Sequence, residues 1–428
     1  MTANRRTQVL ASIGDGIGII PTAPQQRRNS DVLYPFRPDS DFYYLTHFPE
    51  PEAVAVLAPG SKFGDYILFC RERDPKKEIW DGRRAGVEGA VEHYKADCAF
   101  AISKLDEYLP QLMEERERIY YPVGRYAEYD EMVVRWLNAA RRRGRAGIRS
   151  PGEIVDIGQI LHEMRLTKQP EEIEIIKQAA EISASAHRQA MLTSKPGMTE
   201  YQVQAEIEHC FRQHGCEPAY PSIVASGENA CILHYIENSD ELRDNDLLLI
   251  DAGAELDCYA SDITRTFPIN GQFSGPQRAV YEVVLEAQKR AIEAARPGNR
   301  YSDVNDAATE VLVEGLISLG ILKDSKDEAI EKKTYQTYYM HKIGHWIGLD
   351  VHDVGTYRDD AGWRKLEPNI YMTIEPGLYL SPSEELDSKW HGIGIRIEDD
   401  VLITETEPLI LTSNVPKEIN EIEQLMSD

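Results

Sequence analysis

Short apolar runs and longer amphipathic stretches follow one another along the chain, and they predict a mixture of strands and helices. In the first part, the runs at 53–57 and 66–70 predict buried strands. The spacing of apolar residues over 105–117 predicts a helix. In the second part, the apolar stripe that starts at Pro170 predicts a long helix, because proline suits a first helical position.

The start of that helix also marks a domain boundary. A cluster of arginines at 141–145 and the pair Pro151-Gly152 interrupt the pattern before it. We therefore predict two domains, an N-terminal α/β domain over 1–168 and a larger domain over 169–428.

The second domain contains a faint internal repeat. A predicted helix leads to Pro196-Gly197 and a second helix whose apolar face begins at Val203. The same order returns at Pro297-Gly298 and Val304. Two copies indicate a duplicated unit with pseudo-twofold symmetry rather than a solenoid, which needs at least three units.

Four runs rich in β-branched and apolar residues lie between these helices, and they predict strands. They cover 247–253, 259–267, 371–375 and 392–403. Strands beside helices of this kind favour an α+β fold with antiparallel pairing.

Charge and composition exclude several classes of function. The net charge is −25, so the chain lacks the basic surface that binding to nucleic acid requires. Its apolar runs are shorter than the roughly 18–20 residues that span a bilayer, so we expect no membrane segment. The six cysteines form no CxxC pair, which favours reduced thiols in a cytoplasmic protein. Asp15 and nearby glycines interrupt the apolar stretch after Arg5 and Arg6, so we interpret this terminus as mature protein.

Two aspartates stand where burial should be deep. Asp251 follows four large apolar residues, and Asp262 lies in the next predicted strand. A hairpin that turns near 256–257 would place the two directly opposite each other. Like charges in that position are destabilising unless a cation lies between them. The pair therefore favours a site for a hard cation that prefers oxygen ligands.

Two glutamates and three histidines extend this candidate site. Glu375 ends a predicted strand, and Glu398 follows alternating isoleucines; each alone is equally typical of an ordinary ion-paired acid. His341, His345 and His352 crowd one glycine-containing segment. His341 and His345 have the spacing of the zinc motif HExxH, but position 342 is a lysine and no glutamate base is present, which weakens that alternative.

Taken in order, these residues resemble a known ligand set. Asp251, Asp262, His345, Glu375 and Glu398 are similar to the metal ligands of the pita-bread metallopeptidases (M24), which include methionine aminopeptidase, aminopeptidase P, prolidase and creatinase. Longer segments resemble the bacterial aminopeptidase P (Xaa-Pro aminopeptidase) family, namely 227–235, 261–268, 345–353, 392–399, 34–53 and 78–84. The resemblance implies a C-terminal pita-bread domain preceded by a smaller creatinase-like α/β domain.

The resemblance also implies a chemistry. Asp251 would chelate one divalent ion, Asp262 and Glu398 would bridge two, and His345 with Glu375 would hold the second. The family commonly uses manganese, which suits ligands dominated by oxygen. A hydroxide between the two ions would attack the Xaa-Pro bond of peptides with proline at the second position, and Glu375 would accept its proton.

Further residues take roles by the same resemblance. His352 would donate to the oxyanion, His234 would orient the substrate near its prolyl residue, and His341 would line the pocket. Tyr220 and Arg396 would steady Asp251, although Arg396 also fits a plain ion pair with Glu398.

Two positions leave open questions about the pocket and the assembly. Lys342 stands where relatives often have glycine, and it either narrows the pocket or points outward. Trp80 matches a tryptophan that reaches a neighbouring active site in homodimers or homotetramers, but it equally fits a buried core.

Other functions remain open on the sequence alone. A prolidase shares the metal site and differs in substrate. A non-peptide C–N hydrolase such as creatinase keeps the fold without metals, and a non-catalytic binding protein usually loses ligands. The presence of all five ligand types argues against the last two.

Overall fold

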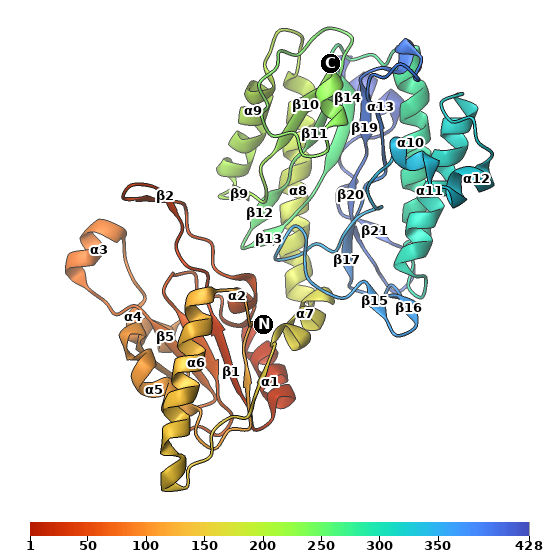
Figure 1. Cartoon of the computed structure of the whole chain (residues 1–428). Coiled ribbons are helices and arrows are strands. Elements are labelled where there is room, and N and C mark those ends of the chain that lie inside the picture. Colours follow the sequence, from red (N-terminus) through yellow and green to blue (C-terminus); the bar gives the residue numbers. More distant parts are fainter. Residues whose placement is uncertain (428) are drawn as a thin grey trace. The chain divides into compact units, whose positions relative to one another are not determined.

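The computed structural model describes residues 1–427, and the chain divides into two compact units, 1–164 and 165–428 (Figure 1). The division falls shortly before the boundary that we predicted at 168. No helix within residues 1–427 combines the length and the apolarity that crossing a bilayer requires.

The first unit is built on a mixed six-stranded sheet in the order β6-β5-β4-β1-β7-β8. Its strands are β1 (Ile17–Pro21), β4 (Val54–Leu57), β5 (Tyr66–Cys70), β6 (Cys98–Ala101), β7 (Arg118–Tyr120) and β8 (Glu153–Val155), and β2 (Arg27–Asn29) pairs with β3 (Val32–Leu33) in a separate hairpin. The helices are α1 (Thr2–Ile13), α2 (Ser40–Thr46), α3 (Pro75–Asp81), α4 (Gly86–Glu92), α5 (Leu105–Leu112), α6 (Ala127–Arg141) and α7 (Gly158–Leu166). The runs that form β4 and β5 are fully buried, as their composition predicted.

One predicted helix of this unit is shorter than expected. The stretch 105–117 forms α5 only as far as Leu112. Pro110 within it has no N–H to continue the ladder, and Glu115 adopts a positive φ of 58°. The chain turns there because residues from Arg118 onward must pair with β1 and β8.

The second unit carries long helices that flank several small antiparallel sheets (Figure 1). The helices are α8 (Pro170–Thr193), α9 (Glu200–Gln213), α10 (Gly275–Ala294), α11 (Tyr301–Ser318), α12 (Lys326–Glu331) and α13 (Ile419–Ser427). The strands of the first half are β9 (Glu217–Pro218), β10 (Ile223–Ser226), β11 (Leu247–Asp251), β12 (Ala254–Leu256), β13 (Tyr259–Ala260) and β14 (Thr264–Pro268). Those of the second half are β15 (Arg358–Asp359), β16 (Gly362–Trp363), β17 (Tyr371–Ile374), β18 (Gly377–Leu380), β19 (Ile393–Arg396), β20 (Asp399–Leu402) and β21 (Leu409–Ile410).

The internal repeat is visible in the backbone hydrogen bonds as well as in the sequence. Gly197 and Gly298 end the two Pro-Gly pairs with φ of 87° and 92°. Their N–H groups donate to the carbonyls of Leu242 and Leu366, both at 2.9 Å. Each leucine lies five residues before a strand, β11 in one copy and β17 in the other. The two copies therefore use the same Pro-Gly turn and the same backbone hydrogen bond to position their central strands.

Candidate metal centre

The two central strands end in acids at equivalent positions. Asp251 and Glu375 each lie nine residues after the leucine that its Pro-Gly turn holds. Asp251 ends β11, and Glu375 directly follows β17, where its N–H donates to the carbonyl of Ile343. The duplication thus explains why two carboxylates approach the same region from different parts of the chain.

Asp251 and Asp262 do not face each other as we predicted. The partner of Asp251 across the ladder is Thr264, because the hairpin turns at Asp257 and Cys258 rather than at 256–257. Asp262 is therefore a diagonal neighbour of Asp251 on the same face. The expectation of one shared site survives the change of register, since a shift by two residues keeps every side chain on its face.

Tyr220 and Arg396 hold the two aspartates together. The Tyr220 hydroxyl lies 2.7 Å from Asp251 Oδ1 and 2.5 Å from Asp262 Oδ1, so its single proton is shared between them. Arg396 Nη2 donates to the other oxygen of Asp251 at 2.5 Å. Both predicted contacts to Asp251 are present in the structure.

Glu398 is connected to this cluster through a residue that the sequence did not single out. Thr264 Oγ1 donates to Glu398 Oε2 at 2.6 Å and accepts from Arg396 Nε at 3.0 Å. Arg396 therefore reaches Glu398 through Thr264, and among the described residues the two form no direct ion pair. The signal for Thr264 was its position two residues after Asp262, which alternation places on the same face.

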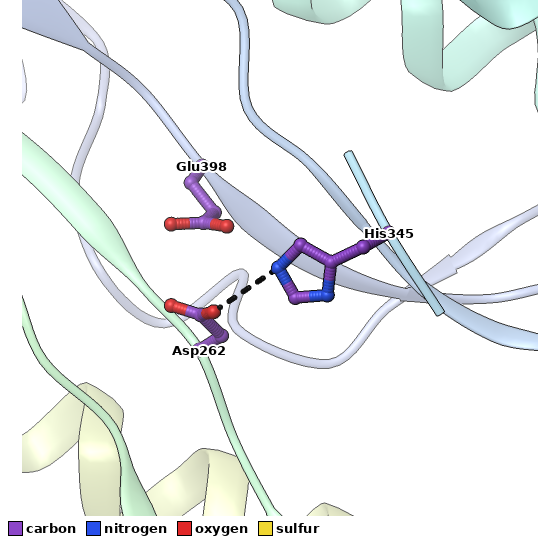
Figure 2. A group of neighbouring side chains, drawn as sticks. All are labelled: Asp262, His345 and Glu398. Carbon is purple, nitrogen blue, oxygen red and sulfur yellow. Dashed lines mark ion pairs between the residues drawn. The ribbon is translucent and has the colours of Figure 1, made fainter. Parts of the chain in front are cut away.

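His345 presents one ring nitrogen to the acids. Its Nδ1 donates to the carbonyl of Trp346 at 3.0 Å, so Nε2 is the nitrogen that faces the acids. Nε2 lies 3.4 Å from Asp262 Oδ2 and 3.7 Å from Glu375 Oε1. Figure 2 shows His345 together with Asp262 and Glu398; ligand atoms of these three residues lie within 4.8 Å of one another.

The other histidines that we predicted for the site meet the ligands in one cavity of about 220 Å³. Its lining includes His234, His341, His352, Lys342 and all five predicted ligands together with Arg396. The rings of His345 and His352 lie 4.4 Å apart, edge to face. Lys342 takes part in the wall, and its ammonium lies 5.3 Å from the centre of the Trp363 ring.

His341 belongs to a hydrogen-bonded chain that includes a second unpredicted residue, Tyr379. His341 Nδ1 donates to the carbonyl of Lys342, so its Nε2 accepts from the Tyr379 hydroxyl at 2.8 Å. That hydroxyl accepts in turn from Arg396 Nη1 at 3.1 Å. Burial lowers the pKa of His341 to about 4, which agrees with a neutral ring.

The electrostatics of this cluster fit a bound cation. Burial raises the pKa of Asp251, Glu375 and Glu398, and the charges of neighbouring acids raise it further. Burial lowers the pKa of His345, but the bond to Asp262 and the charge of Glu375 outweigh it and raise the value to about 9. The two buried carboxylates of Asp262 and Glu398 converge with the imidazole of His345, and two further acids line the same cavity; this is a donor set that suits a divalent ion.

Trp80 lies in the first unit, on α3. Its side chain is 86% exposed and that of Ile79 is 81% exposed, and no residue of the helix is buried. The alternative of a core tryptophan is therefore wrong.

Family models and similar proteins agree with the two-domain fold described above. The model of metallopeptidase family M24 matches residues 174–405, and that of the aminopeptidase P N-terminal domain matches 2–120. The chain is 46% identical to the Xaa-Pro aminopeptidase of Escherichia coli K12 over 410 residues, which cover 95% of this chain and 93% of that protein.

Two solved structures have the same fold along the whole chain. The Pseudomonas aeruginosa aminopeptidase PepP superposes with a TM-score of 0.98 at 50% identity, covering 100% of this chain and 97% of that one. The zinc-substituted E. coli aminopeptidase P in complex with product superposes with a TM-score of 0.96 at 44% identity and the same coverage. These matches confirm the predicted fold, a pita-bread domain preceded by an aminopeptidase P N-terminal domain. The chain belongs to metallopeptidase family M24.

Proposed function

We propose that the chain is an Xaa-Pro aminopeptidase that removes the residue preceding proline from the N-terminus of peptides. The observation that carries the proposal is the cluster of four carboxylates, of which Asp262 and Glu398 are buried, and one imidazole in a single cavity. Full-length similarity to Xaa-Pro aminopeptidases gives the substrate class. An Xaa-Pro bond is a tertiary amide without an N–H, so a dedicated polar cavity suits it.

The acids and the histidine would hold two divalent ions. We assign Asp251 to one ion, Asp262 and Glu398 to both, and His345 with Glu375 to the other. Manganese is favoured because oxygen ligands outnumber nitrogen ligands. When bound, such ions polarise the scissile carbonyl and acidify a water.

The other side chains of the cavity supply proton transfer and orientation. Glu375, whose pKa burial raises, is placed to accept a proton and return it to the prolyl nitrogen. Burial and the neighbouring His345 lower the pKa of His352, and its neutral ring can donate an N–H to the carbonyl oxygen. His234 would orient the prolyl residue, and His341 would line the pocket.

A comparison of substrates and metals tests the proposal. Xaa-Pro, Xaa-Pro-Yaa and Met-Ala peptides are assayed with manganese, with zinc and with a chelator. We expect manganese-dependent cleavage of Xaa-Pro-Yaa. Preference for the dipeptide would favour a prolidase, and preference for the methionyl peptide would favour another branch of the family. Equal activity after chelation, or in Asp262→Asn, would contradict the metal mechanism.

We further propose that the protein works in the cytoplasm as a homodimer or homotetramer in which Trp80 lies at a neighbouring active site. The six free cysteines support a reducing compartment. The exposed pair Ile79 and Trp80 supports a contact between copies, since such side chains are normally covered. Trp80→Ala should lower kcat/KM and weaken the oligomer in gel filtration. Val134→Ala, at a side chain 51% exposed on α6, serves as the control. Unchanged kinetics in an intact oligomer would remove the role of Trp80.

A further inference from the structure

Glu200, the first residue of α9, is a fully buried carboxylate that gathers five hydrogen bonds. Oε1 accepts from the N–H and hydroxyl of Ser226, both at 2.7 Å, and from Asn229 Nδ2 at 3.1 Å. Oε2 accepts from the Tyr235 hydroxyl at 2.8 Å and the Asp240 N–H at 2.9 Å. All five donors belong to residues 226–240, so one side chain fixes both ends of that segment. The positive end of α9 stabilises the buried charge further.

This segment carries His234 to the wall of the cavity. Of the described residues, 232–246 belong to no helix or strand, so their position depends on side-chain anchors. Tyr235, the residue directly after His234, is only 5% exposed, and its hydroxyl donates to the carboxylate of Glu200. The backbone position of His234 is therefore tied to that of Tyr235.

The second copy of the internal repeat uses the equivalent residue in the same way. Tyr301 begins α11 as Glu200 begins α9, and their N–H groups donate to the carbonyls of Arg364 at 3.0 Å and Asp240 at 2.9 Å. The Tyr301 hydroxyl donates to the carbonyl of Gly344 at 2.5 Å, beside His345. In both copies, the first residue of the second helix holds the segment that brings histidine to the cavity.

We infer that Glu200 is a positioning residue that acts on the substrate through His234. Its five bonds hold residues 226–240 in the place where the ring can meet the prolyl part of a peptide. The identity of the substrate in this inference rests on the proposed function. The anchoring of residues 226–240 by Glu200 is independent of it.

Glu200→Gln tests this inference because the amide keeps the shape and replaces one acceptor oxygen by a donor group. We expect kcat/KM for Xaa-Pro-Yaa to fall roughly 10-fold, mainly through KM, since a displacement of about 1 Å can cost a hundredfold. Amide hydrogen exchange should become faster in 226–240 and stay unchanged in 341–353. In the His234→Ala background, Glu200→Gln should have no further effect. Glu206→Gln, an exposed acid on the same helix, is the matched control.

Several outcomes would overturn the inference. The inference fails if Glu200→Gln leaves both KM and hydrogen exchange in 226–240 unchanged. It also fails if Glu200→Gln lowers kcat/KM as much in the His234→Ala background as in the native protein, because that result indicates a general structural role. If Glu200→Gln does not fold, Tyr235→Phe decides the question, because it removes one donor and leaves the carboxylate in place. If the unmodified enzyme does not cleave Xaa-Pro-Yaa but exchange in 226–240 rises in the variant, the proposed function fails and the anchoring role stands.

Discussion

Glu398 and Asp399 are consecutive and fully buried acids, yet their pKa values are shifted in opposite directions. Burial and the charges of Asp262 and Glu375 raise the pKa of Glu398 well above its usual range. Burial would also raise the pKa of Asp399, but the charges of Arg265 and Lys417 lower it well below its usual range. The two residues belong to different regions, the acid-rich cavity and an ion-paired network.

The ion-paired network satisfies Asp399 completely. Oδ1 accepts from Arg265 Nη2 and Thr412 Oγ1, both at 2.7 Å. Oδ2 accepts from Lys417 Nζ and Gln288 Nε2, both at 2.6 Å. A buried carboxylate with two cations and two neutral donors is a structural element that needs no further ligand.

Asp353 forms a second network of the same kind. Its two oxygens accept from Arg165 Nη2 at 2.5 Å and from Lys168 Nζ at 3.0 Å. Burial would raise the pKa of Asp353, but both cations lower it below its usual value. Burial alone therefore does not mark a functional acid in this protein. The acids of the cavity differ in that other acids lie beside them, so the cluster carries more negative charge than Arg396 alone neutralises.

The largest expected effect comes from neutralising an acid of the cavity. Glu398→Gln should lower kcat/KM by at least about 1000-fold, or about 4 kcal/mol of transition-state stabilisation. The metal-free variant should be no less stable than the metal-free native protein, because an amide at this position is not repelled by Asp262 and Glu375. Kinetics and urea unfolding in chelator measure the two effects. Asp257→Asn, in the exposed turn of the β12–β13 hairpin, is the control. A large loss of stability in metal-free Glu398→Gln would instead show that this acid, like Asp399, stabilises the fold.

Neutralising Asp399 should have the opposite effect, a loss of stability that does not depend on metal. Asp399→Asn leaves the buried Arg265 and the partly buried Lys417 with one negative charge fewer, which should cost about 3 kcal/mol or more of unfolding free energy. The loss should appear with and without metal in urea unfolding. Glu418→Gln, which breaks the exposed pair with Lys289, should change stability little. A loss seen only in the metal-loaded protein would contradict the distinction between the two regions.

Removal of metal should affect the cavity alone. A ligand at 100 times its dissociation constant stabilises the folded state by about 2.7 kcal/mol, so chelation should lower Tm in the native protein. The same treatment should leave Tm unchanged in Glu398→Gln if that variant no longer binds metal. Differential scanning calorimetry with and without added manganese measures both. An equal shift in the two proteins would show that the chelator acts elsewhere.

The smallest effect concerns acid pH. Because its folded pKa is lowered, Asp353 contributes stability above its unfolded value of about 4, and this contribution is lost as pH falls through the folded value. Asp353→Asn should therefore be less stable than the native protein at pH 7, and the difference should narrow at pH 3 by up to about 1 kcal/mol. Urea midpoints at both pH values measure it, and a constant difference would count against the ion-pair explanation.

Much of the fold followed from local patterns. The apolar runs that became β4, β5, β11 and β17 and the helix that begins at Pro170 needed only periodicity and a proline at a first helical position. The Pro-Gly repeat predicted the duplication because a glycine at positive φ is a local requirement. Alternation also placed Arg396 and Glu398 together. The roles of the site residues as ligands and catalytic groups stay predictions.

What the sequence missed depends on contacts between distant parts of the chain. The hairpin after β11 placed Thr264, not Asp262, opposite Asp251, because the turn residues lie one position later than expected. Tyr379 has no local pattern that connects it to His341. The sequence analysis did not single out Glu200, because its partners lie up to 40 residues away.

The sequence by itself determined the order of acids and histidines, the duplicated helices and the strands that end in Asp251 and Glu375, because each depends on neighbouring residues. Only the tertiary structure decided which buried acids are matched by the chain's own cations and which are not. Glu398 and Asp399 have the same local surroundings in sequence. Arg265 lies 134 residues from Asp399, and its position there can be known only once β14 and β20 are placed in the fold. The free energy of a buried charge depends on such partners, and they are brought together by folding rather than by proximity along the chain.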